Sequence, residues 1–363
     1  MRVALLNPCF WPEVQRGAER VVRELATDLI AGGHEPRLIT SHPGPPSTTV
    51  EDGLPIVRNW RPPDRLLLKR GAQEYLTHLP FSYASLARGD DDVAHAFYPT
   101  DAVVARRWGE RHGRPSILWF GGIPQRDQLA SRRGRLRVLL EAVEGCDAVV
   151  VSSNAAAAGI RRWFDVEART IYPGVRLEDF ADRPPRDEPP TIACAADPDD
   201  ARKRIGMLVE AFRQVRRSRR DTRLLLVRPR DPGTAGELAA EEGIDLLDQA
   251  PGAPAELFHR AWVSALAAYN EAFGLVLVES LACGTPVVGM ADGGVPEIVD
   301  RPGIGTLFDG SGEDLARALL ETLELAEDPR TAERCRARAA DFTTQRTATE
   351  CVRLYEELIA RLA

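Results

Sequence analysis

The stretch that decides the fold is Asn270-Glu271-Ala272-Phe273-Gly274-Leu275-Val276-Leu277-Val278-Glu279-Ser280-Leu281-Ala282-Cys283-Gly284-Thr285-Pro286-Val287-Val288. Its hydrophobic pattern predicts the end of one strand, a loop, an apolar helix over 275–283 and a second strand over 286–290. Gly284 stands where the helix must stop, because glycine is the usual residue after a helix C-terminus. A helix between two buried strands forms a β-α-β unit, so we expect a parallel sheet.

The N-terminus of this predicted helix is a candidate anion site. The backbone N–H groups of Phe273, Gly274 and Leu275 have no partners inside the helix, and the helix dipole is positive at this end. A diphosphate is the natural ligand of such a site. Gly274 carries no side chain, so a phosphate can approach its backbone closely.

Two glutamates flank the expected diphosphate. A helical side chain leans toward the helix N-terminus, so Glu279 is placed to accept hydrogen bonds from two vicinal hydroxyls, as on a ribose. Glu271, in the loop on the other side, can do the same for a hexose. The alternative is that Glu279 lies at the rim of a half-exposed helix and that Glu271 is an ordinary loop charge.

The same alternation of strands and helices fills both halves of the chain, on either side of a proline-rich and charged linker at 172–190. Strands are predicted at 2–7, 37–40, 93–97, 116–120, 148–152, 191–195, 223–227, 244–247, 263–268 and 286–290. We therefore expect an α/β protein of two Rossmann-like domains, with parallel sheets that face across a cleft. The expected domains are 1–172 and 173–345, followed by a terminal helix at 346–363.

Composition and missing motifs narrow the class. The chain has 363 residues and a net charge of −7, which argues against nucleic acid as a partner. No apolar run is long enough to span a membrane, and the run at residues 1–8 is too short for a signal peptide, so we expect neither. Six scattered cysteines without a C-x-x-C pair indicate reduced thiols and a cytoplasmic protein. Neither G-x-G-x-x-G at the first β-α turn nor a P-loop motif is present, so a dinucleotide or an NTPase site is not indicated.

Taken together, these segments resemble family 4 of the retaining glycosyltransferases, which has the two-domain fold called GT-B. The segment from Glu271 to Glu279 looks like the E-x7-E signature of that family. The resemblance extends over most of the chain, to the segments at 293–299, 11–20, 172–180 and 342–355. In that family the last helix crosses back to the first domain.

The resemblance implies an activity and assigns roles. The family transfers a sugar, with retention at the anomeric carbon, from a nucleoside-diphosphate sugar that binds mainly to the C-terminal domain. By this likeness Glu271 contacts the donor sugar, Glu279 contacts the ribose and Lys203 neutralises the leaving diphosphate. Lys203 is one of only two lysines among 47 basic residues. The implied donor is of the UDP, GDP or dTDP type, with no cofactor, and the acceptor is a small molecule, a lipid-linked sugar or a glycan.

Three positions depart from the family pattern. Asp197 stands where an arginine usually contacts the diphosphate, and we expect Arg202, or else Arg204, to supply the missing charge. The alternatives are that the diphosphate binds more weakly or that Asp197 turns away from it. Phe97 replaces the second of two alternating histidines. Arg16-Gly17 replaces a Gly-Gly pair, although Gly17 still allows a phosphate or an acceptor to approach.

The acceptor site is expected in the first domain. His95, and Trp119-Phe120-Gly121 at a strand end, are the candidate acceptor residues, with core packing as the alternative. No cluster has metal-ligand spacing, and Asp90-Asp91-Asp92 is interpreted as a loop leading into a strand, so we expect no metal.

A basic run is a further feature of the first domain. It can bind a membrane or an anionic acceptor, or it can be a solvated helix face. Its residues are Arg132, Arg133, Arg135 and Arg137.

Two other functions remain open. Asp197 and Phe97 can mark a sugar-nucleotide-binding partner that assists another enzyme, in which case the isolated protein would not hydrolyse a donor. A sugar-nucleotide epimerase on the same fold would turn over without an acceptor.

Overall fold

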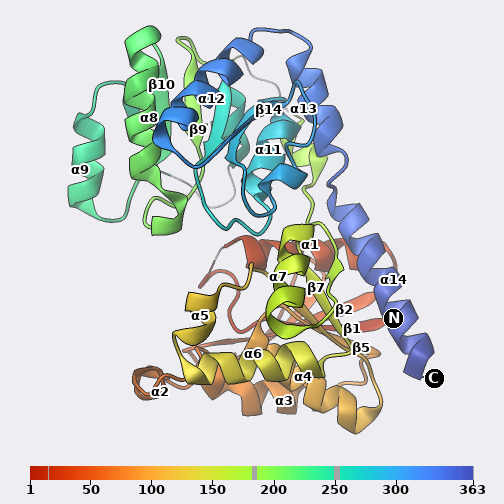
Figure 1. Ribbon diagram of the computed structural model, residues 1–363. Coiled ribbons are helices and arrows are strands. Elements are labelled where there is room, and N and C mark those ends of the chain that lie inside the picture. The colour runs from red at the N-terminus through yellow and green to blue at the C-terminus, as the bar shows by residue number, and fades with distance from the viewer. Residues whose placement is uncertain (15, 182–185, 249–253, 363) are drawn as a thin grey trace. The chain divides into compact units, whose positions relative to one another are not determined.

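The computed structural model describes residues 1–14, 16–181, 186–248 and 254–362. The chain forms two compact units, Met1–Pro173 together with Thr344–Ala363, and Gly174–Thr343 (Figure 1). The sequence placed these boundaries after residues 172 and 345. The expected linker at 172–190 contains the short helix η2, Leu177–Phe180, while its residues 182–185 lie outside the described part of the chain.

The first unit is built on an eight-stranded sheet in the order β3-β4-β2-β1-β5-β6-β7-β8. Seven strands run parallel, and β3 pairs antiparallel with β4. The strands are β1 Arg2–Leu6, β2 Glu35–His42, β3 Ser47–Glu51, β4 Leu54–Trp60, β5 Val93–Ala96, β6 Ser116–Phe120, β7 Ala148–Val151 and β8 Arg169–Thr170.

The β3–β4 hairpin was not predicted. Every residue of β3 is exposed, so this edge strand has no apolar alternation to detect. A turn signal was nevertheless present, because Asp52-Gly53 is a dipeptide typical of two-residue hairpins. Both residues have positive φ, 50° and 82°, as such a turn requires.

Helices cover both faces of this sheet. Helix α1 turns its apolar side, with Val22, Leu25 and Leu29, toward the sheet, and α14 packs beside α1. On the other face α4 packs against α3 and α6. The helices are α1 Gly17–Ala31, α2 Arg65–Lys69, α3 Leu79–Ala87, α4 Pro99–His112, α5 Arg126–Ala130, α6 Arg133–Gly145, α7 Asn154–Phe164 and α14 Thr344–Leu362, with a short η1 at Leu76–His78.

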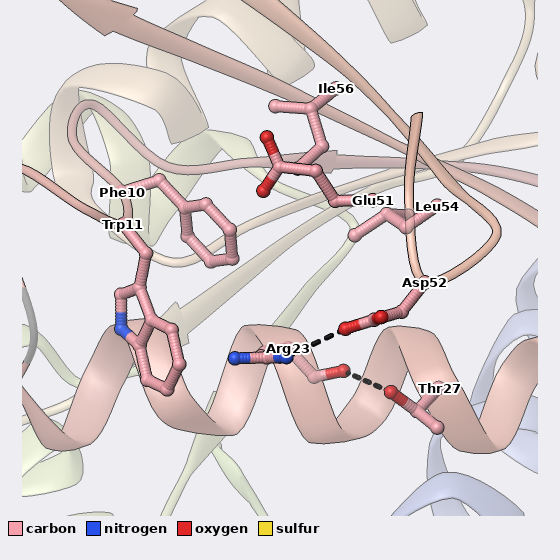
Figure 2. A pocket seen from close by; sticks show the side chains of 8 residues that line it. All are labelled: Phe10, Trp11, Arg23, Thr27, Glu51, Asp52, Leu54 and Ile56. Atoms are coloured by element: carbon pink, nitrogen blue, oxygen red, sulfur yellow. Dashed lines mark hydrogen bonds and ion pairs between the residues drawn. The ribbon is translucent and has the colours of Figure 1, made fainter. Parts of the chain in front are cut away.

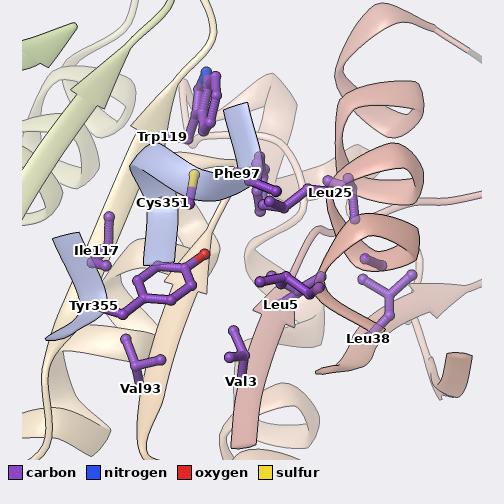
Figure 3. Close-up of a cluster of buried hydrophobic side chains, with 14 of the residues drawn as sticks. Val3, Leu5, Leu25, Leu38, Val93, Phe97, Ile117, Trp119, Cys351 and Tyr355 are labelled. Carbon is purple, nitrogen blue, oxygen red and sulfur yellow. The ribbon is translucent and has the colours of Figure 1, made fainter. Parts of the chain in front are cut away.

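The end of the chain completes the core of the first unit. Tyr355 and Cys351 of α14 lie among apolar side chains of β1, β5 and β6, as Figure 3 shows. Both are fully buried. Burying a large side chain contributes about 1.5–3 kcal/mol, so α14 is part of the folded first unit.

The second unit has a six-stranded, all-parallel sheet in the order β11-β10-β9-β12-β13-β14. Its strands are β9 Thr191–Cys194, β10 Arg223–Val227, β11 Ile244–Leu247, β12 Val263–Leu266, β13 Val287–Met290 and β14 Gly305–Phe308. Its helices are α8 Ile205–Ser218, α9 Pro232–Ala240, α10 Pro254–Arg260, α11 Leu275–Cys283, α12 Gly312–Leu325 and α13 Thr331–Ala339, with short helices η3 at Ala201–Lys203 and η4 at Val295–Glu297. The prediction of an α/β protein with two parallel-sheet domains is confirmed.

Strand order fixes where ligands can bind. The chain leaves β9 toward β10 and leaves β12 toward β13, so the crossover helices α8 and α11 lie on opposite faces of the sheet. The loops that follow β9 and β12 therefore diverge at a topological switch point, which is where open α/β sheets bind ligands. In the first unit β1 and β5 form the equivalent point.

Two sequence-based expectations concern the whole chain. All six cysteines are free, and five of them are buried. Within the described ranges, no helix combines the length and the apolar character needed to cross a membrane.

Candidate functional site

The loop from β12 to α11 reaches the helix through a left-handed residue. Gly274 has φ 102° and ψ 53°, a conformation that favours glycine, and it precedes the first helical residue, Leu275. In the described part of the chain, the N–H groups of Gly274 and Leu275 have no hydrogen-bond partner. The N-terminus of α11 thus offers donors at the switch point.

Lys203 and Glu271 meet at this edge of the sheet. Lys203 ends η3, in the loop after β9, and Glu271 lies in the loop after the neighbouring strand β12. The Lys203 Nζ lies 2.5 Å from Glu271 Oε2, and each side chain is 18% exposed. The fold thus brings together the two residues predicted to be catalytic, which are 68 positions apart in the sequence.

A second loop holds Glu271 in place. The Gly294 N–H donates to the Glu271 carbonyl oxygen at 2.9 Å, and the Asn270 N–H donates to Asp292 Oδ2 at 2.6 Å. A Cβ on Gly293 would lie 2.3 Å from the Glu271 carbonyl oxygen, so only glycine fits this close approach. The Gly293-Gly294 pair in the sequence was the signal for this clamp, although its role was not predicted.

The other members of the signature lie deeper. Glu279 is only 3% exposed, and it belongs to a helix with seven buried residues out of nine. The Phe273 ring is buried against Phe342, with ring centroids 5.3 Å apart. Phe273 can therefore serve a ligand only through its backbone, while Leu275 is partly exposed.

Arg202 does not contact Asp197. Its guanidinium pairs with Asp200, with Nη2 2.6 Å from Oδ2, and the Asp200 side chain also accepts from the Arg202 backbone N–H. Arg204 turns elsewhere and donates to the Gly310 carbonyl oxygen at 2.9 Å.

The cation beside Asp197 is one that sequence reasoning missed. Arg230, in the loop after β10, donates from Nη2 to Asp197 Oδ2 at 3.2 Å and from Nε to Asp199 Oδ2 at 2.6 Å. Its side chain is 79% exposed. No local pattern relates Arg230 to Asp197, because the contact joins loops that follow two different strands.

In the first unit, Gly17 opens α1. A Cβ at this position would meet no atom within 4 Å, so the space beside Gly17 is open. Arg16 beside it donates to the buried Glu19 at 3.1 Å, and Glu19 also accepts from the Arg16 backbone N–H. Burial, reinforced by the charge of Glu19, raises the pKa of the neighbouring Cys9 thiol to about 12.

His95 and Trp119 lie in the core. His95 is fully buried, and its Nδ1 forms a 2.7 Å hydrogen bond with Tyr355 Oη. Burial lowers the pKa of His95 to about 3. The rings of His95 and Phe97 stack at 4.5 Å, and Trp119 is 3% exposed.

This placement favours the core alternative for both residues, since neither presents surface to an acceptor. Of the acceptor candidates, Gly121 is exposed and Phe120 is partly exposed.

A small pocket lies between α1 and the β3–β4 hairpin (Figure 2). Arg23 stacks over the Trp11 ring at 4.5 Å and pairs with Asp52 at 2.6 Å. The lining residues are Phe10, Trp11, Arg23, Thr27, Glu51, Asp52, Leu54 and Ile56. Its volume of about 60 Å³ is far below the roughly 300–1,000 Å³ of typical ligand sites, so we assign it no substrate.

Each of the three aspartates at positions 90–92 interacts with an arginine. Asp91 pairs with Arg37 at 2.6 Å, Asp90 pairs with the Arg2 side chain, and Asp92 accepts from the Arg2 backbone N–H at 2.8 Å. Within the ranges that the structure covers, no group of three or more His, Cys, Asp or Glu side chains could hold a metal ion.

Two family models match the chain. "Glycosyltransferase Family 4" matches residues 15–179, and "Glycosyl transferases group 1" matches residues 176–342. Together they span both units, and the chain belongs to family 4 of the glycosyltransferases, with the GT-B fold. It is accordingly a glycosyltransferase of the hexosyltransferase type, as the resemblance predicted.

Curated glycosyltransferases are also similar to the chain. The chain is 41% identical to a D-inositol 3-phosphate glycosyltransferase of Corynebacterium jeikeium, over 33% of this chain and 30% of that protein. The chain thus spans less than a third of that relative's length in the match. It is 27% identical to an MMP alpha-(1->4)-mannosyltransferase of Mycolicibacterium hassiacum, over the whole of both chains.

Solved structures show the same fold. Sucrose-phosphate synthase from Thermosynechococcus elongatus has a TM-score of 0.83 and 22% identity, over 99% of each chain. The Anabaena protein HepE, in complex with UDP-glucose, has a TM-score of 0.74 and 16% identity, over 98% of this chain and 100% of that one.

Proposed function

We propose that this enzyme transfers a hexose from a nucleoside-diphosphate sugar to an acceptor hydroxyl, with retention at the anomeric carbon and without a metal ion. The observation that carries the proposal is the Lys203–Glu271 pair at the switch point of the second unit, where α11 presents unpaired N–H groups. A cation and helix N–H donors suit a diphosphate, and a carboxylate suits sugar hydroxyls.

The residues divide the work as follows. The diphosphate accepts hydrogen bonds from the N–H groups at Gly274 and Leu275, and Lys203 balances its charge. Glu279 binds the ribose hydroxyls and Glu271 binds the hexose. The glycosidic bond to the diphosphate breaks, the acceptor oxygen bonds to the anomeric carbon, and the acceptor proton passes to the leaving diphosphate. Negative charge grows on the bridging oxygen as that bond breaks, so Lys203 stabilises the transition state more than the ground state.

The comparisons support the donor class and the stereochemistry. HepE, which shares the fold, binds UDP-glucose. The mannosyltransferase relative is named for an alpha linkage, which fits retention from an alpha-linked donor. Six free cysteines fit the reducing cytoplasm as the place of action.

Arg230 is proposed as a second diphosphate cation in place of the arginine missing at position 197. Asp197 and Asp199 hold it at the loop that carries Lys203, and its Nη1 group has no partner among the described residues. Arg202 was the expected substitute, but Asp200 already accepts from its Nε and Nη2 groups.

A donor panel tests the proposal. The protein is incubated with the hexose donors of UDP, GDP and dTDP, with and without EDTA, and nucleotide release is followed together with the anomeric signal of the sugar by NMR. Slow release of nucleotide, undiminished by EDTA, with the first-formed sugar in the alpha configuration before it mutarotates, is the expected result. Donor binding without release would support the auxiliary-protein alternative, and conversion of the donor sugar without an acceptor would support an epimerase. Loss of activity in EDTA that Mg²⁺ or Mn²⁺ restores would contradict metal independence.

A further inference from the structure

Exposed apolar side chains gather in one segment of the first unit, residues 60–81. Of the eight large hydrophobic residues exposed in the described part of the chain, four lie at positions 60–81. Leu66 and Leu67 of α2 are 76% and 38% exposed, and Trp60 and Phe81 form an exposed edge-to-face pair with ring centroids 5.9 Å apart. Exposed leucines and aromatic rings that cluster in one segment indicate an interaction surface.

Hydrogen bonds join the two parts of this segment that flank α2. The Tyr75 N–H donates to Asp64 Oδ2 at 3.2 Å, and Thr77 Oγ1 donates to the Pro62 carbonyl oxygen at 2.6 Å. The segment before α2 and the segment after it are therefore tied together, so α2 projects from a closed loop. Its three leucines, at positions 66–68, lie outside the core, since α2 has no buried residue.

The basic run at the start of α6 lies directly beside α2. The Gly134 N–H donates to the Gly71 carbonyl oxygen at 3.2 Å. A Cβ on Gly134 would lie 2.7 Å from that oxygen, so the two backbones are in close contact. Arg132 Nη1 also lies 3.8 Å from Glu74 Oε1. Figure 1 shows α2 at the end of α6 where that helix begins.

The joined segments carry a strong positive charge on an acidic protein. We call residues 60–81 and 126–137 the basic-apolar surface. Its exposed cations are Arg65, Lys69, Arg70, Arg126, Arg132, Arg133 and Arg137. Only three carboxylates, Asp64, Glu74 and Asp127, accompany them, whereas the chain as a whole has a net charge of −7.

We propose that the basic-apolar surface docks on an anionic lipid bilayer. Cations attract the surface of a bilayer that contains acidic lipids, and each basic residue near it strengthens binding about fivefold. Leucines and aromatic rings enter the boundary between headgroups and acyl chains, where an amphipathic helix lies in the plane of the membrane. A nucleic acid or another polyanion would use the cations but would gain nothing from exposed leucines.

Vesicle sedimentation tests this proposal on the full chain. Vesicles of phosphatidylcholine alone are compared with vesicles that also contain phosphatidylglycerol. We expect binding only to the second kind. Leu66→Ser/Leu67→Ser should weaken it at least about tenfold, and Lys69→Ser/Arg70→Ser about 25-fold, from about fivefold for each cation.

Matched controls remove the same groups elsewhere. Arg217→Ser/Arg220→Ser takes two exposed arginines from the second unit, and Leu362→Ser takes an exposed leucine from the end of α14. Both should bind vesicles like the unchanged protein. Thermal unfolding and nucleotide-sugar binding, measured for every variant, show whether it is folded.

Two results would overturn the proposal. One is equal binding to both kinds of vesicle, or to neither. The other is a leucine variant that binds normally while the Lys69→Ser/Arg70→Ser variant loses affinity for vesicles and for heparin alike, because that outcome describes a polyanion surface. Both results are independent of donor turnover, so the proposed transfer reaction can stand without this surface.

Discussion

The topological switch points of the two units differ in the kind of side chain found there. In the second unit, polar side chains of neighbouring loops meet at the edge of the sheet, and the Lys203–Glu271 pair remains partly open to solvent. In the first unit, His95 and Trp119 are buried, and the aromatic ring of Phe97 stacks on His95. One edge presents a charged pair, whereas at the other the aromatic strand residues are packed into the core and open space lies beside Gly17.

This difference separates the proposed donor site from the proposed acceptor site. The donor half depends on a glycine with positive φ, a helix N-terminus and a paired lysine, all within short segments. The acceptor half depends on which residues α14 and the aromatic strand ends leave exposed. We therefore expect substitutions in the second unit to change catalysis and donor binding, and substitutions at His95 to change stability.

The largest effect is expected from Lys203→Ala. Lys203 stabilises charge that develops only as the glycosidic bond breaks, so kcat should fall by about 10²–10³, or about 2.7–4 kcal/mol, with a smaller change in donor affinity. Lys203→Arg keeps the positive charge but should restore only part of the rate, because the planar guanidinium directs its donors differently. Arg220→Ala, at an exposed cation elsewhere in the second unit, is the control. A Lys203→Ala enzyme that keeps more than about a third of kcat would remove Lys203 from the leaving-group site.

Glu279→Ala should weaken nucleotide-sugar binding by about 10- to 150-fold. Glu279 is buried on α11, and hydrogen bonds to a charged group contribute about 1.5–3 kcal/mol. Titration calorimetry with the donor measures this change, and the exposed Glu324→Ala on α12 is the matched control. Unchanged affinity in a folded Glu279→Ala protein would place the ribose elsewhere.

The buried His95 should make the first unit sensitive to acid. Burial lowers its pKa to about 3, whereas the unfolded chain has a histidine pKa near 6.5. Its contribution to stability is therefore complete above about pH 6.5 and is lost as the pH falls toward 3, because the unfolded state binds the proton first. Between pH 7.5 and pH 5.0 the loss should be about 2 kcal/mol, at about 1.4 kcal/mol per pH unit below 6.5.

Urea unfolding at the two pH values checks this prediction. His95→Gln should lose less stability than the unchanged protein over this interval, while the exposed His112→Gln should behave like the unchanged protein. If His95→Gln is equally acid-sensitive, protonation of another group dominates.

The smallest effect is expected from the exposed arginines, because solvent screens their interactions. Arg230→Ala should weaken donor binding about 3- to 10-fold, and Arg202→Ala less. The double variant Asp197→Arg/Arg230→Ala moves the cation to the neighbouring loop and should regain affinity. If Arg202→Ala is the more harmful change, Arg202 is the second cation and the proposal for Arg230 is wrong.

Strands and helices of the second unit could be predicted from local sequence patterns. Strands 223–227 and 244–247 and helix 275–283 have the predicted bounds, since each combines an apolar run with a clear stop. The β3–β4 hairpin was not predicted, because its outer strand has no buried face.

Contacts between distant segments could not be predicted from local patterns. His95 is held by Tyr355, 260 residues away, and Arg230 meets Asp197 only because their strands are neighbours in the sheet. Burial of a strand residue by a helix at the end of the chain leaves no mark on the strand itself.

Hydrogen–deuterium exchange with and without UDP-glucose tests the central claim most directly, namely that the donor diphosphate binds at the N-terminus of α11. We predict slower exchange of the amides at Gly274 and Leu275, and of the loop that ends at Lys203, when the donor is added. The same experiment on Glu279→Ala at equal donor concentration should show weaker protection. Donor-dependent protection confined to other segments, with no change at residues 271–276, would contradict the account.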